Sequence, residues 1–350
     1  MLLFGMSARE IKQEADKIIK KNIQNERNQQ RVNQELNQTS SILIMIRLGI
    51  SLDRIARRLD MNRKTVSELS DRFQWIKNEL NQGRSIPECA KKLSFPEPLI
   101  WSIALEEKTD QERFKALNWG LLTWDHWYWN DVDHRFGDDW PGRIPAQLVA
   151  HTLFYFSREN QLVFDPMAGG GVVPDICLIF HRRCWSFDLV DRVKTRPEIE
   201  CYHWNPADLK WPIKSRHKPD LIFIDPPYFK KMEGQYSKDS ISSLSRKEYL
   251  TFFKELFLLI FDHSTASARL AFLNADWRDF QGIPALEEDR RKSIFITDYS
   301  TLLSEAGWEI TQFIDCPMSS QRFHAGIVSQ MQQKRILGIT RRTLIIARKG

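Results

Sequence analysis

The sequence predicts an α/β fold in which a mostly parallel sheet ends in an antiparallel strand, preceded by a small all-α domain. From about residue 111, short runs of β-branched and aromatic residues alternate with helical segments, which is the pattern of a parallel sheet. The last two runs have no predicted helix between them, so we expect these two strands to pair antiparallel. Before residue 111, apolar residues recur with helical spacing.

The composition is that of a globular protein without a membrane span or a metal site. Of 350 residues, 42% are hydrophobic and 27% are charged, and 12 Trp and 21 Phe provide material for a core. Apolar runs such as 256–261 are far shorter than the roughly 20 residues that a spanning helix needs. The five cysteines form no Cys-x-x-Cys pair and the eight histidines no His-x-x-x-His pair, so neither zinc nor a disulfide framework is indicated. We expect a cytoplasmic protein with no membrane association and no metal.

Positive charge is concentrated at the two ends of the sequence. Residues 1–110 hold 19 Lys and Arg against 15 Asp and Glu, whereas residues 111–315 hold 25 against 30. Residues 316–350 hold seven basic residues and no acidic one. Because Lys and Arg neutralise phosphates and release counterions, this distribution favours a polyanionic partner, although many proteins without such a partner also carry basic tails.

Residues 1–41 are predicted to form a polar helical extension. Ile11, Ile18 and Val32 fall on a seven-residue grid, but polar residues interrupt it. We expect a solvated helix, and a homodimer through this helix is an alternative that the sequence leaves open.

Residues 42–110 contain two copies of one segment at an offset of 34 residues. Each copy predicts a short helix, a turn and a second helix. In the first copy Ser51 is placed to cap a helix, residues 60–62 form the turn, and the small Ala56 permits the two helices to cross closely. The matching pairs are Gly49 and Gly83, Ser51 and Ser85, Ile55 and Cys89, Ala56 and Ala90, Arg57 and Lys91, Arg58 and Lys92, Leu59 and Leu93, Val66 and Ile100, and Leu69 and Ile103.

Each copy resembles the helix-turn-helix segments of bacterial DNA-binding proteins. The second helix of the first copy opens with side chains suited to base edges and phosphates, namely Asn62, Arg63, Lys64 and Thr65. The second copy opens with the apolar and acidic residues 95–98, which are poor at reading DNA. We predict that the first copy binds duplex DNA, with the alternative that both copies are helical hairpins used for packing or protein contact.

Residues 111–350 are predicted to form the α/β domain. The Trp-rich segment 119–140 is expected to pack on this domain as a buried linker. The predicted strands are 162–166, 184–189, 200–204, 221–227, 268–273, 308–314 and 342–349.

Two motifs follow predicted strands of this domain. The run Val163–Gly171 leads from a strand into a turn with three glycines, whose backbone allows the close approach of a ligand. The run Ile224–Tyr228 ends an apolar strand with Asp225, two prolines and a tyrosine. The prolines remove two backbone donors, which leaves carbonyl acceptors beside the carboxylate and an aromatic face. Such a group can hold an exocyclic amine while stacking on its ring.

Together the motifs resemble those of the amino-methyltransferases, the S-adenosylmethionine-dependent enzymes that methylate adenine N6 or cytosine N4 in DNA. The family's glycine motif reads roughly DPFxGSGT and its catalytic motif (D/N/S)PP(Y/F/W). This sequence has DPMAGGG at 165–171 and DPPY at 225–228, in the family's order. The resemblance covers about residues 135–350 and implies a Rossmann-like methyltransferase sheet. It departs from the family at Met167, where an aromatic residue is usual, and at Gly170 and Gly171, which replace a Ser/Thr-containing end.

The resemblance implies S-adenosylmethionine as the cofactor. Asp188, at the end of the second predicted strand, corresponds to the family's acid on the cofactor ribose, and Asp208 corresponds more loosely to an acidic residue near the adenine amino group. Arg143 and Pro145 fall in a segment that borders the methionine end in the family. The glycine motif contributes Asp165, Pro166, Met167, Ala168, Gly169 and Gly171.

The resemblance assigns catalysis to Asp225, Pro226, Pro227 and Tyr228. An aromatic amine is a poor nucleophile because its lone pair is delocalised into the ring. Hydrogen bonds to the Asp225 carboxylate and the Pro226 carbonyl would aim that lone pair at the methyl group. Tyr228 would stack on the base, which must leave the duplex to reach it. An aspartate at the first position favours adenine in this family.

Basic residues near the C-terminus are expected to share target recognition with the first helix-turn-helix copy, because no large separate recognition domain follows the catalytic motif. They are Arg322, Lys334, Arg335, Arg341 and Arg342. The sequence thus predicts a site-specific methyltransferase that acts on adenine N6 in double-stranded DNA. The alternatives are an N4-cytosine DNA methyltransferase, an RNA base methyltransferase, and a DNA-binding regulator whose methyltransferase domain only binds ligand.

Overall fold

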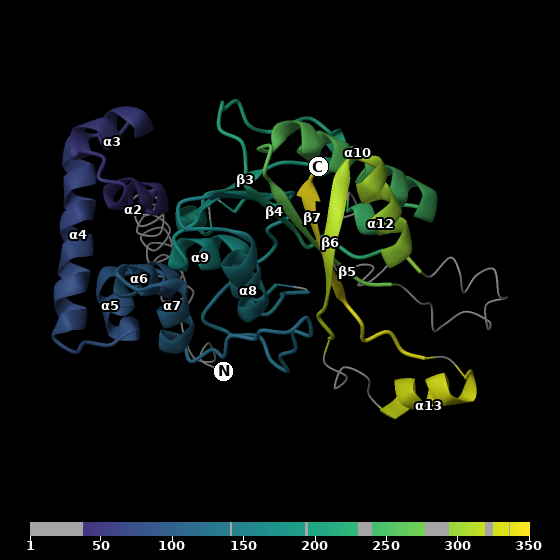
Figure 1. The fold of residues 1–350 in the computed structure, drawn as a ribbon. Helices are drawn as coiled ribbons and strands as arrows, with labels where there is room; N and C mark the ends of the chain where they lie inside the picture. The colour runs from purple at the N-terminus through teal and green to yellow at the C-terminus, as the bar shows by residue number, and fades with distance from the viewer. Residues whose placement is uncertain are drawn as a thin grey trace, which may run out of the picture.

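The computed structural model describes residues 38–140, 142–192, 195–229, 240–276, 294–318, 325–335 and 337–350. The predicted helical extension lies almost wholly outside these residues, as does the dimer alternative attached to it. Figure 1 shows a group of helices at one end of the molecule and a sheet flanked by helices at the other.

Seven strands form one sheet in the order β3-β2-β1-β4-β5-β7-β6. The pairs from β3 through β5 are parallel, and β7 is antiparallel to both β5 and β6. This arrangement confirms the predicted α/β class, a Rossmann-like sheet with an antiparallel last strand, and each of the seven predicted runs corresponds to one strand. The strands are β1 (Leu162–Asp165), β2 (Arg183–Asp188), β3 (Cys201–His203), β4 (Leu221–Ile224), β5 (Arg269–Asn274), β6 (Trp308–Asp315) and β7 (Thr343–Lys349).

The prediction that no helix separates the last two strands is wrong. Helix α13 (Ala325–Gln333) lies between them in the chain. None of its described residues is buried, so α13 stands off the sheet and does not disturb the pairing of β6 with β7. Figure 1 shows α13 beyond the end of β6.

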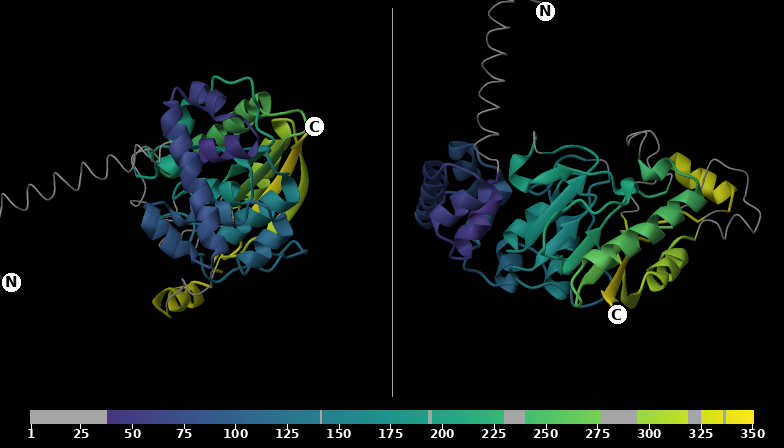
Figure 2. Two further views of the ribbon diagram at one scale, coloured as in Figure 1. Left: turned by 90° about the vertical axis from the view of Figure 1, so that its left-hand side faces the viewer. Right: turned by 90° about the horizontal axis from the view of Figure 1, so that it is seen from above.

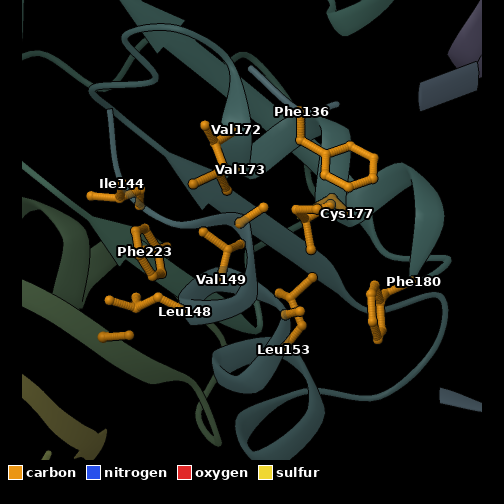
Figure 3. Close-up of a cluster of buried hydrophobic side chains, with 14 of the residues drawn as sticks. Phe136, Ile144, Leu148, Val149, Leu153, Val172, Val173, Cys177, Phe180 and Phe223 are labelled. Carbon is orange, nitrogen blue, oxygen red and sulfur yellow. The ribbon is translucent and has the colours of Figure 1, made fainter. Parts of the chain in front are cut away.

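Helices cover both faces of the sheet because successive side chains of its buried strands point to opposite sides. In β4, Leu221 and Phe223 join the core to which α8 (Ala146–Phe156) and α9 (Val172–Ile179) contribute. Figure 3 shows Phe223 near Leu148 and Val149 of α8. Ile222 and Ile224 join the core beneath α10 (Arg246–His263) and α12 (Ile296–Glu305). Short 3-10 helices η1 (Pro197–Ile199), η2 (Pro206–Asp208) and η3 (Ile241–Ser243) connect some of these elements.

Both repeat copies form the expected helix pairs and share a separate core. The helices of this part are α2 (Thr39–Arg47), α3 (Leu52–Leu59), α4 (Arg63–Asn81), α5 (Ile86–Leu93), α6 (Glu97–Ala104) and α7 (Asp110–Ala116). As the spacing indicates, Ile55 and Ala56 of α3 are buried. Ser51 does occupy the N-cap position of α3, but its side chain makes no capping hydrogen bond there.

Polar contacts that reach far along the chain fix the helical part to the α/β part. Ser102 of α6 donates to the Leu178 carbonyl oxygen of α9 at 2.8 Å, and Leu178 itself is buried in the helical core. Ser41 of α2 donates through both its backbone N–H (2.9 Å) and its hydroxyl (2.7 Å) to the Glu200 carboxylate. Burial raises the pKa of Glu200, and these two hydrogen bonds partly offset the rise.

The prediction that the Trp-rich segment 119–140 is a buried linker is confirmed only in part. Trp119 and Trp127 are buried in the core, whereas Trp124 is 59% exposed and Trp140 lines the cavity described below. The segment also runs beside the end of β6, where the Trp127 backbone N–H donates to the Asp315 carbonyl oxygen at 2.7 Å. None of the helices in the described part of the chain is both long and apolar enough to cross a membrane.

Candidate active site

A cavity of about 560 Å³ opens at the carboxyl ends of β1, β2 and β4. It lies where the chain order of the sheet reverses, because β1 continues to β2 on one side and pairs with β4 on the other. Ligands of open α/β sheets bind at such points. The lining residues are Trp140, Gly142, Arg143, Ile144, Asp165, Pro166, Met167, Ala168, Gly169, Gly170, Val172, Val173, Asp188, Leu189, Val190, Asn205, Pro206, Asp225, Pro226, Pro227, Tyr228, Ser240, Ile241, Met318 and Arg342.

The glycine turn is packed closely by protein atoms. A Cβ on Gly169 would lie 3.0 Å from Trp140 Nε1, and a Cβ on Gly170 would lie 2.9 Å from the Trp140 Cβ. At Gly171, which has φ +84° and precedes α9, a Cβ would lie 2.8 Å from a methyl carbon of Ile199. The sequence explanation, that the glycines leave room for a ligand, is therefore incomplete, since Trp140 and Ile199 themselves need that room.

Asp165 ends β1 and is buried at the floor of the cavity. One carboxylate oxygen accepts the Met167 backbone N–H at 3.1 Å, and the other has no partner among the described residues. Burial raises the pKa of Asp165 well above its usual range, and the nearby Asp188 and Asp225 carboxylates add to the rise. A cation bound beside this carboxyl would relieve the penalty on its charged form.

Asp188 ends β2 and is better supplied with donors. Its carboxylate accepts the backbone N–H of Gly169 at 2.8 Å and that of Val190 at 2.9 Å. Burial raises the pKa of Asp188, whereas these hydrogen bonds act in the opposite direction. The first of them also ties the glycine turn after β1 to the end of β2.

The Asp225–Tyr228 segment follows β4 directly and is held by one hydrogen bond within the segment and one from α10. The Tyr228 hydroxyl donates to Asp225 Oδ1 at 2.9 Å. The buried Tyr249 of α10 donates its hydroxyl to the Pro227 carbonyl oxygen at 3.0 Å. Burial raises the pKa of Tyr228 well above its usual range, and the adjacent Asp225 raises it further. The tyrosine therefore stays a neutral phenol.

The structure brings most of the predicted cofactor and catalytic residues to one cavity, but not all of them. Gly171 and Pro145 do not line it and instead precede α9 and α8. Asp208 is exposed in η2 and also does not line it, while Asn205 and Pro206 of the same turn do. Arg143 lines the cavity, and its guanidinium donates to the carbonyl oxygens of Gly137 and Asp138 at 3.2 and 3.0 Å.

Several residues that line the cavity were not predicted as site residues from the sequence. Trp140 was expected in the core but stands between the glycine turn and Arg192, whose guanidinium lies 5.0 Å from the indole ring centre. Met318 comes from the end of β6, and Ser240 and Ile241 come from the segment before α10. Arg342 was predicted to share target recognition with the other basic residues near the C-terminus, but it is buried directly before β7 and lines the cavity instead. No local motif marks these positions, because they reach the cavity through the packing of the sheet.

The predicted DNA-contacting residues of the first helix-turn-helix copy lie at the start of α4. Asn62 caps this helix, since its side chain accepts the Lys64 backbone N–H at 2.8 Å. Asn62, Arg63 and Lys64 are exposed, and Thr65 is half-buried. Arg63 pairs with Asp53 at 3.1 Å, and Lys64 lies 3.8 Å from Glu68. These are exposed pairs, which contribute little to stability.

The predicted basic residues near the C-terminus are spread around α13 and β7. Lys334 and Arg335 directly follow α13, and Arg341 is exposed 3.9 Å from Asp315. Arg322 lies outside the described residues. Figures 1 and 2 show α3 and α13 at opposite ends of the molecule, so the two predicted DNA-binding regions do not form one continuous surface. Within the described ranges, no group of three His, Cys, Asp or Glu is placed to hold a metal ion.

Comparisons with known proteins give likeness of fold only. No family model matches the sequence, and no curated protein matches it. Solved structures that are similar include a putative sarcosine dimethylglycine methyltransferase from Galdieria sulphuraria, at 11% identity over 59% of this chain and 85% of that chain, with a TM-score of 0.39. TrmN from Thermus thermophilus has 12% identity over 59% of this chain and 48% of that chain, with a TM-score of 0.34. Precorrin-6y C5,15-methyltransferase from Geobacter metallireducens GS-15 has 11% identity over 63% and 97%, with a TM-score of 0.36. At these values the likenesses carry no argument about activity, which has to come from the site.

Proposed function

We propose that the protein is an S-adenosylmethionine-dependent methyltransferase that acts on adenine N6 in double-stranded DNA. One observation carries this proposal. The glycine turn after β1, the carboxylate at the end of β2 and the Asp225–Tyr228 segment after β4 share a single cavity at the switch point of the sheet. In this proposal the cofactor site and the amine-accepting site adjoin each other within that cavity.

The cavity residues fit the proposed cofactor. Asp165 has a buried oxygen with no partner among the described residues, which suits the ammonium group of the cofactor, and Asp188 offers acceptors for ribose hydroxyls. Apolar side chains, among them Met167, Val190 and Pro206, line the cavity beside these carboxylates and suit an adenine ring. When bound, S-adenosylmethionine supplies an electrophilic methyl group, so no metal is required.

The chain's own residues would handle the target base. Asp225 accepts a hydrogen bond from the exocyclic amine and is placed to take the proton that the methylated nitrogen releases. The Tyr228 ring offers a stacking surface for the extruded base, which offsets part of the cost of unstacking it from the duplex. Positioning and electrostatics supply the rate enhancement.

DNA is proposed as the substrate because of the first helix-turn-helix copy. Its second helix presents exposed Asn62, Arg63 and Lys64 at its start, the part of such a helix that meets base edges. The basic residues after α13 would add phosphate contacts.

Labelled methyl transfer separates this proposal from its alternatives. The purified protein is incubated with radiolabelled S-adenosylmethionine and either unmethylated duplex DNA or bulk RNA, and the nucleic acid is digested to nucleosides. Label in N6-methyladenine from DNA is expected. Label in N4-methylcytosine corrects the base, and label only in RNA corrects the substrate. Cofactor binding without label in either nucleic acid would favour a regulator that only binds ligand.

A further inference from the structure

A short strap of the chain, residues 137–140, lies against the glycine turn. The Asp138 backbone N–H donates to the Gly170 carbonyl oxygen at 2.8 Å. Trp140 packs closely against Gly169 and Gly170 and lines the cavity. The strap therefore forms one wall of the cavity at the point where the glycine turn enters it.

Two buried arginines hold the strap through the Asp138 carboxylate. Arg192 pairs with Asp138 Oδ2, and its guanidinium lies 5.0 Å from the ring centre of Trp140. Arg196 Nη1 lies 3.5 Å from Asp138 Oδ1 and donates to the Gly170 carbonyl oxygen at 3.4 Å. Arg192 and Arg196 are 6% and 9% exposed, whereas the Asp138 side chain is 39% exposed. We call the group formed by Asp138, Arg192 and Arg196 the clasp.

The clasp is anchored to α9, the helix that begins directly after the glycine turn. Arg196 Nη2 donates to Asp175 Oδ1 at 2.7 Å, and its Nε donates to Glu198 Oε1 at 2.8 Å. Asp175, in the first turn of α9, also accepts the Gly137 backbone N–H at 2.8 Å. Burial alone would lower the pKa of Arg196, but the Asp175 and Glu198 carboxylates raise it above its usual value. Arg196 is thus a fixed point to which the strap is attached.

None of the four strap residues is fully buried, so the hydrophobic effect contributes less to the position of the strap than it does in the core. We propose that the clasp holds the strap against the glycine turn and thereby sets the affinity for the cofactor, with Asp138 as the positioning residue. This inference rests on the S-adenosylmethionine site of the proposed function. If loss of the clasp left the strap docked in one tenth of the molecules, the observed Kd would rise about tenfold, because only these molecules present the complete wall.

Removing the charge of Asp138 tests the clasp. Asp138→Asn keeps the size of the side chain and the backbone hydrogen bond to Gly170. The Kd for S-adenosylmethionine, measured by calorimetry, is expected to rise about tenfold, whereas kcat at saturating cofactor should stay unchanged because bound cofactor restores the docked strap. The control is Asp110→Asn, which also loses ion pairs with two arginines, Arg113 and Arg182, but away from the cavity. An unchanged Kd in Asp138→Asn, or an equal rise in both variants, would overturn the proposal.

A double-mutant cycle tests whether the clasp acts by placing Trp140. In a Trp140→Ala background the strap has no indole ring to place, so adding Asp138→Asn should raise the Kd little further. A double variant whose rise in Kd is the product of the two single rises would overturn the proposal.

A further measurement depends on neither turnover nor cofactor. In protein labelled with 5-fluorotryptophan, the ¹⁹F resonance of Trp140 is the one that Trp140→Phe removes. Asp138→Asn should move this resonance in the cofactor-free protein, because the ring leaves its place on the glycine turn, whereas Asp110→Asn should not. An unmoved resonance overturns the proposal even if the protein methylates DNA. A moved resonance and a raised Kd, in a protein that methylates neither DNA nor RNA, support the clasp and overturn the proposed function.

Discussion

The carboxyl side chains of three residues, Asp165, Asp188 and Asp225, line one cavity. They differ in the groups that donate hydrogen bonds to them. Asp188 accepts two backbone N–H groups, whereas Asp165 is more deeply buried and accepts one. The charged form of Asp165 is therefore poorly stabilised in the free protein, and its pKa is raised well above the usual range. Such a carboxyl reduces stability at neutral pH and gains from a bound cation.

Replacing Asp165 with asparagine should separate these two effects. A raised pKa in the folded state means that folded Asp165 binds its proton more tightly than unfolded Asp165 does. The free energy of unfolding therefore falls as the pH rises above the pKa that Asp165 has in the unfolded chain. Asp165→Asn removes this dependence while still accepting the Met167 N–H. We expect the free energy of unfolding of the cofactor-free variant, measured in urea at pH 8, to exceed that of the wild type by about 1–3 kcal/mol. The gain should be smaller at pH 5. Its affinity for S-adenosylmethionine should fall, and a destabilised variant at pH 8 would contradict the account.

The contact between Trp140 and the glycine turn gives another residue-scale prediction. Gly169→Ala places a Cβ 3.0 Å from the Trp140 indole nitrogen and should displace that ring from the cavity wall. We expect the Kd for S-adenosylmethionine, measured by calorimetry, to rise about tenfold, which corresponds to about 1.4 kcal/mol. Gly49→Ala is the control, since Gly49 also has positive φ but has no atom within 4 Å of an added Cβ. Equal Kd values for S-adenosylmethionine in the two variants would mean that Trp140 does not contribute to cofactor binding.

At the scale of elements, α10 supports the Asp225–Tyr228 segment that follows β4. Tyr249 packs in the core of this helix face and reaches the Pro227 carbonyl oxygen with its hydroxyl. A Ser245–Glu248 capping box begins α10, so the helix that carries Tyr249 is well defined. The position of the segment thus depends on a helix that sequence reasoning did not connect with catalysis.

Removal of the Tyr249 hydroxyl should loosen the segment without unfolding the helix. Tyr249→Phe is expected to lower kcat several-fold, since the lost hydrogen bond contributes about 1 kcal/mol, and to leave cofactor affinity unchanged. Tyr155→Phe is a matched control, because it also loses a bond to a backbone carbonyl, that of Leu122, but away from the cavity. Both variants would be compared by initial rates of methyl transfer. The same rate loss in both would mean that the Pro227 contact has no particular role.

The elements also show how far the sequence alone could reach. Strand runs, the repeated helix pairs and the two motifs are local patterns, and each corresponds to a feature of the structure. Helix α13 was not predicted, because none of its described residues is buried and its sequence therefore lacks a helical apolar periodicity. Trp140 precedes the glycine motif by about 25 residues, and Arg342 follows the Asp225–Tyr228 motif by about 115 residues. Only tertiary packing brings these two side chains to the cavity.

At the scale of the whole molecule, the helical part is fixed at one end while α13 lies at the other (Figure 1). Contacts of Ser102 with Leu178 and of Ser41 with Glu200 hold the helical part against the α/β part. The first helix-turn-helix copy should therefore act as a tether for DNA beside the cavity's own target contacts.

Substitutions at the start of α4 should weaken this tether alone. The double variant Arg63→Ala, Lys64→Ala, which keeps the Asn62 cap of α4, is expected to bind duplex DNA more weakly and with a shallower dependence on salt, because fewer phosphates are neutralised. Lys91→Ala with Lys92→Ala removes the same formal charge from the second copy and serves as the control. Cofactor affinity should be unchanged in both. Identical DNA affinities and salt slopes for the two variants would contradict DNA binding by the first copy.

The most direct test of the central claim measures methyl transfer and cofactor binding in one pair of proteins, the wild type and Asp225→Ala. Transfer is measured as N6-methyladenine formed in duplex DNA, and binding as the Kd for S-adenosylmethionine by calorimetry. We expect Asp225→Ala to abolish transfer and to keep a Kd close to that of the wild type, because Asp225 is proposed to accept the target amine, whereas the glycine turn and Asp188 are proposed to hold the cofactor. A variant that still methylates adenine, or one that loses cofactor binding together with activity, would contradict it.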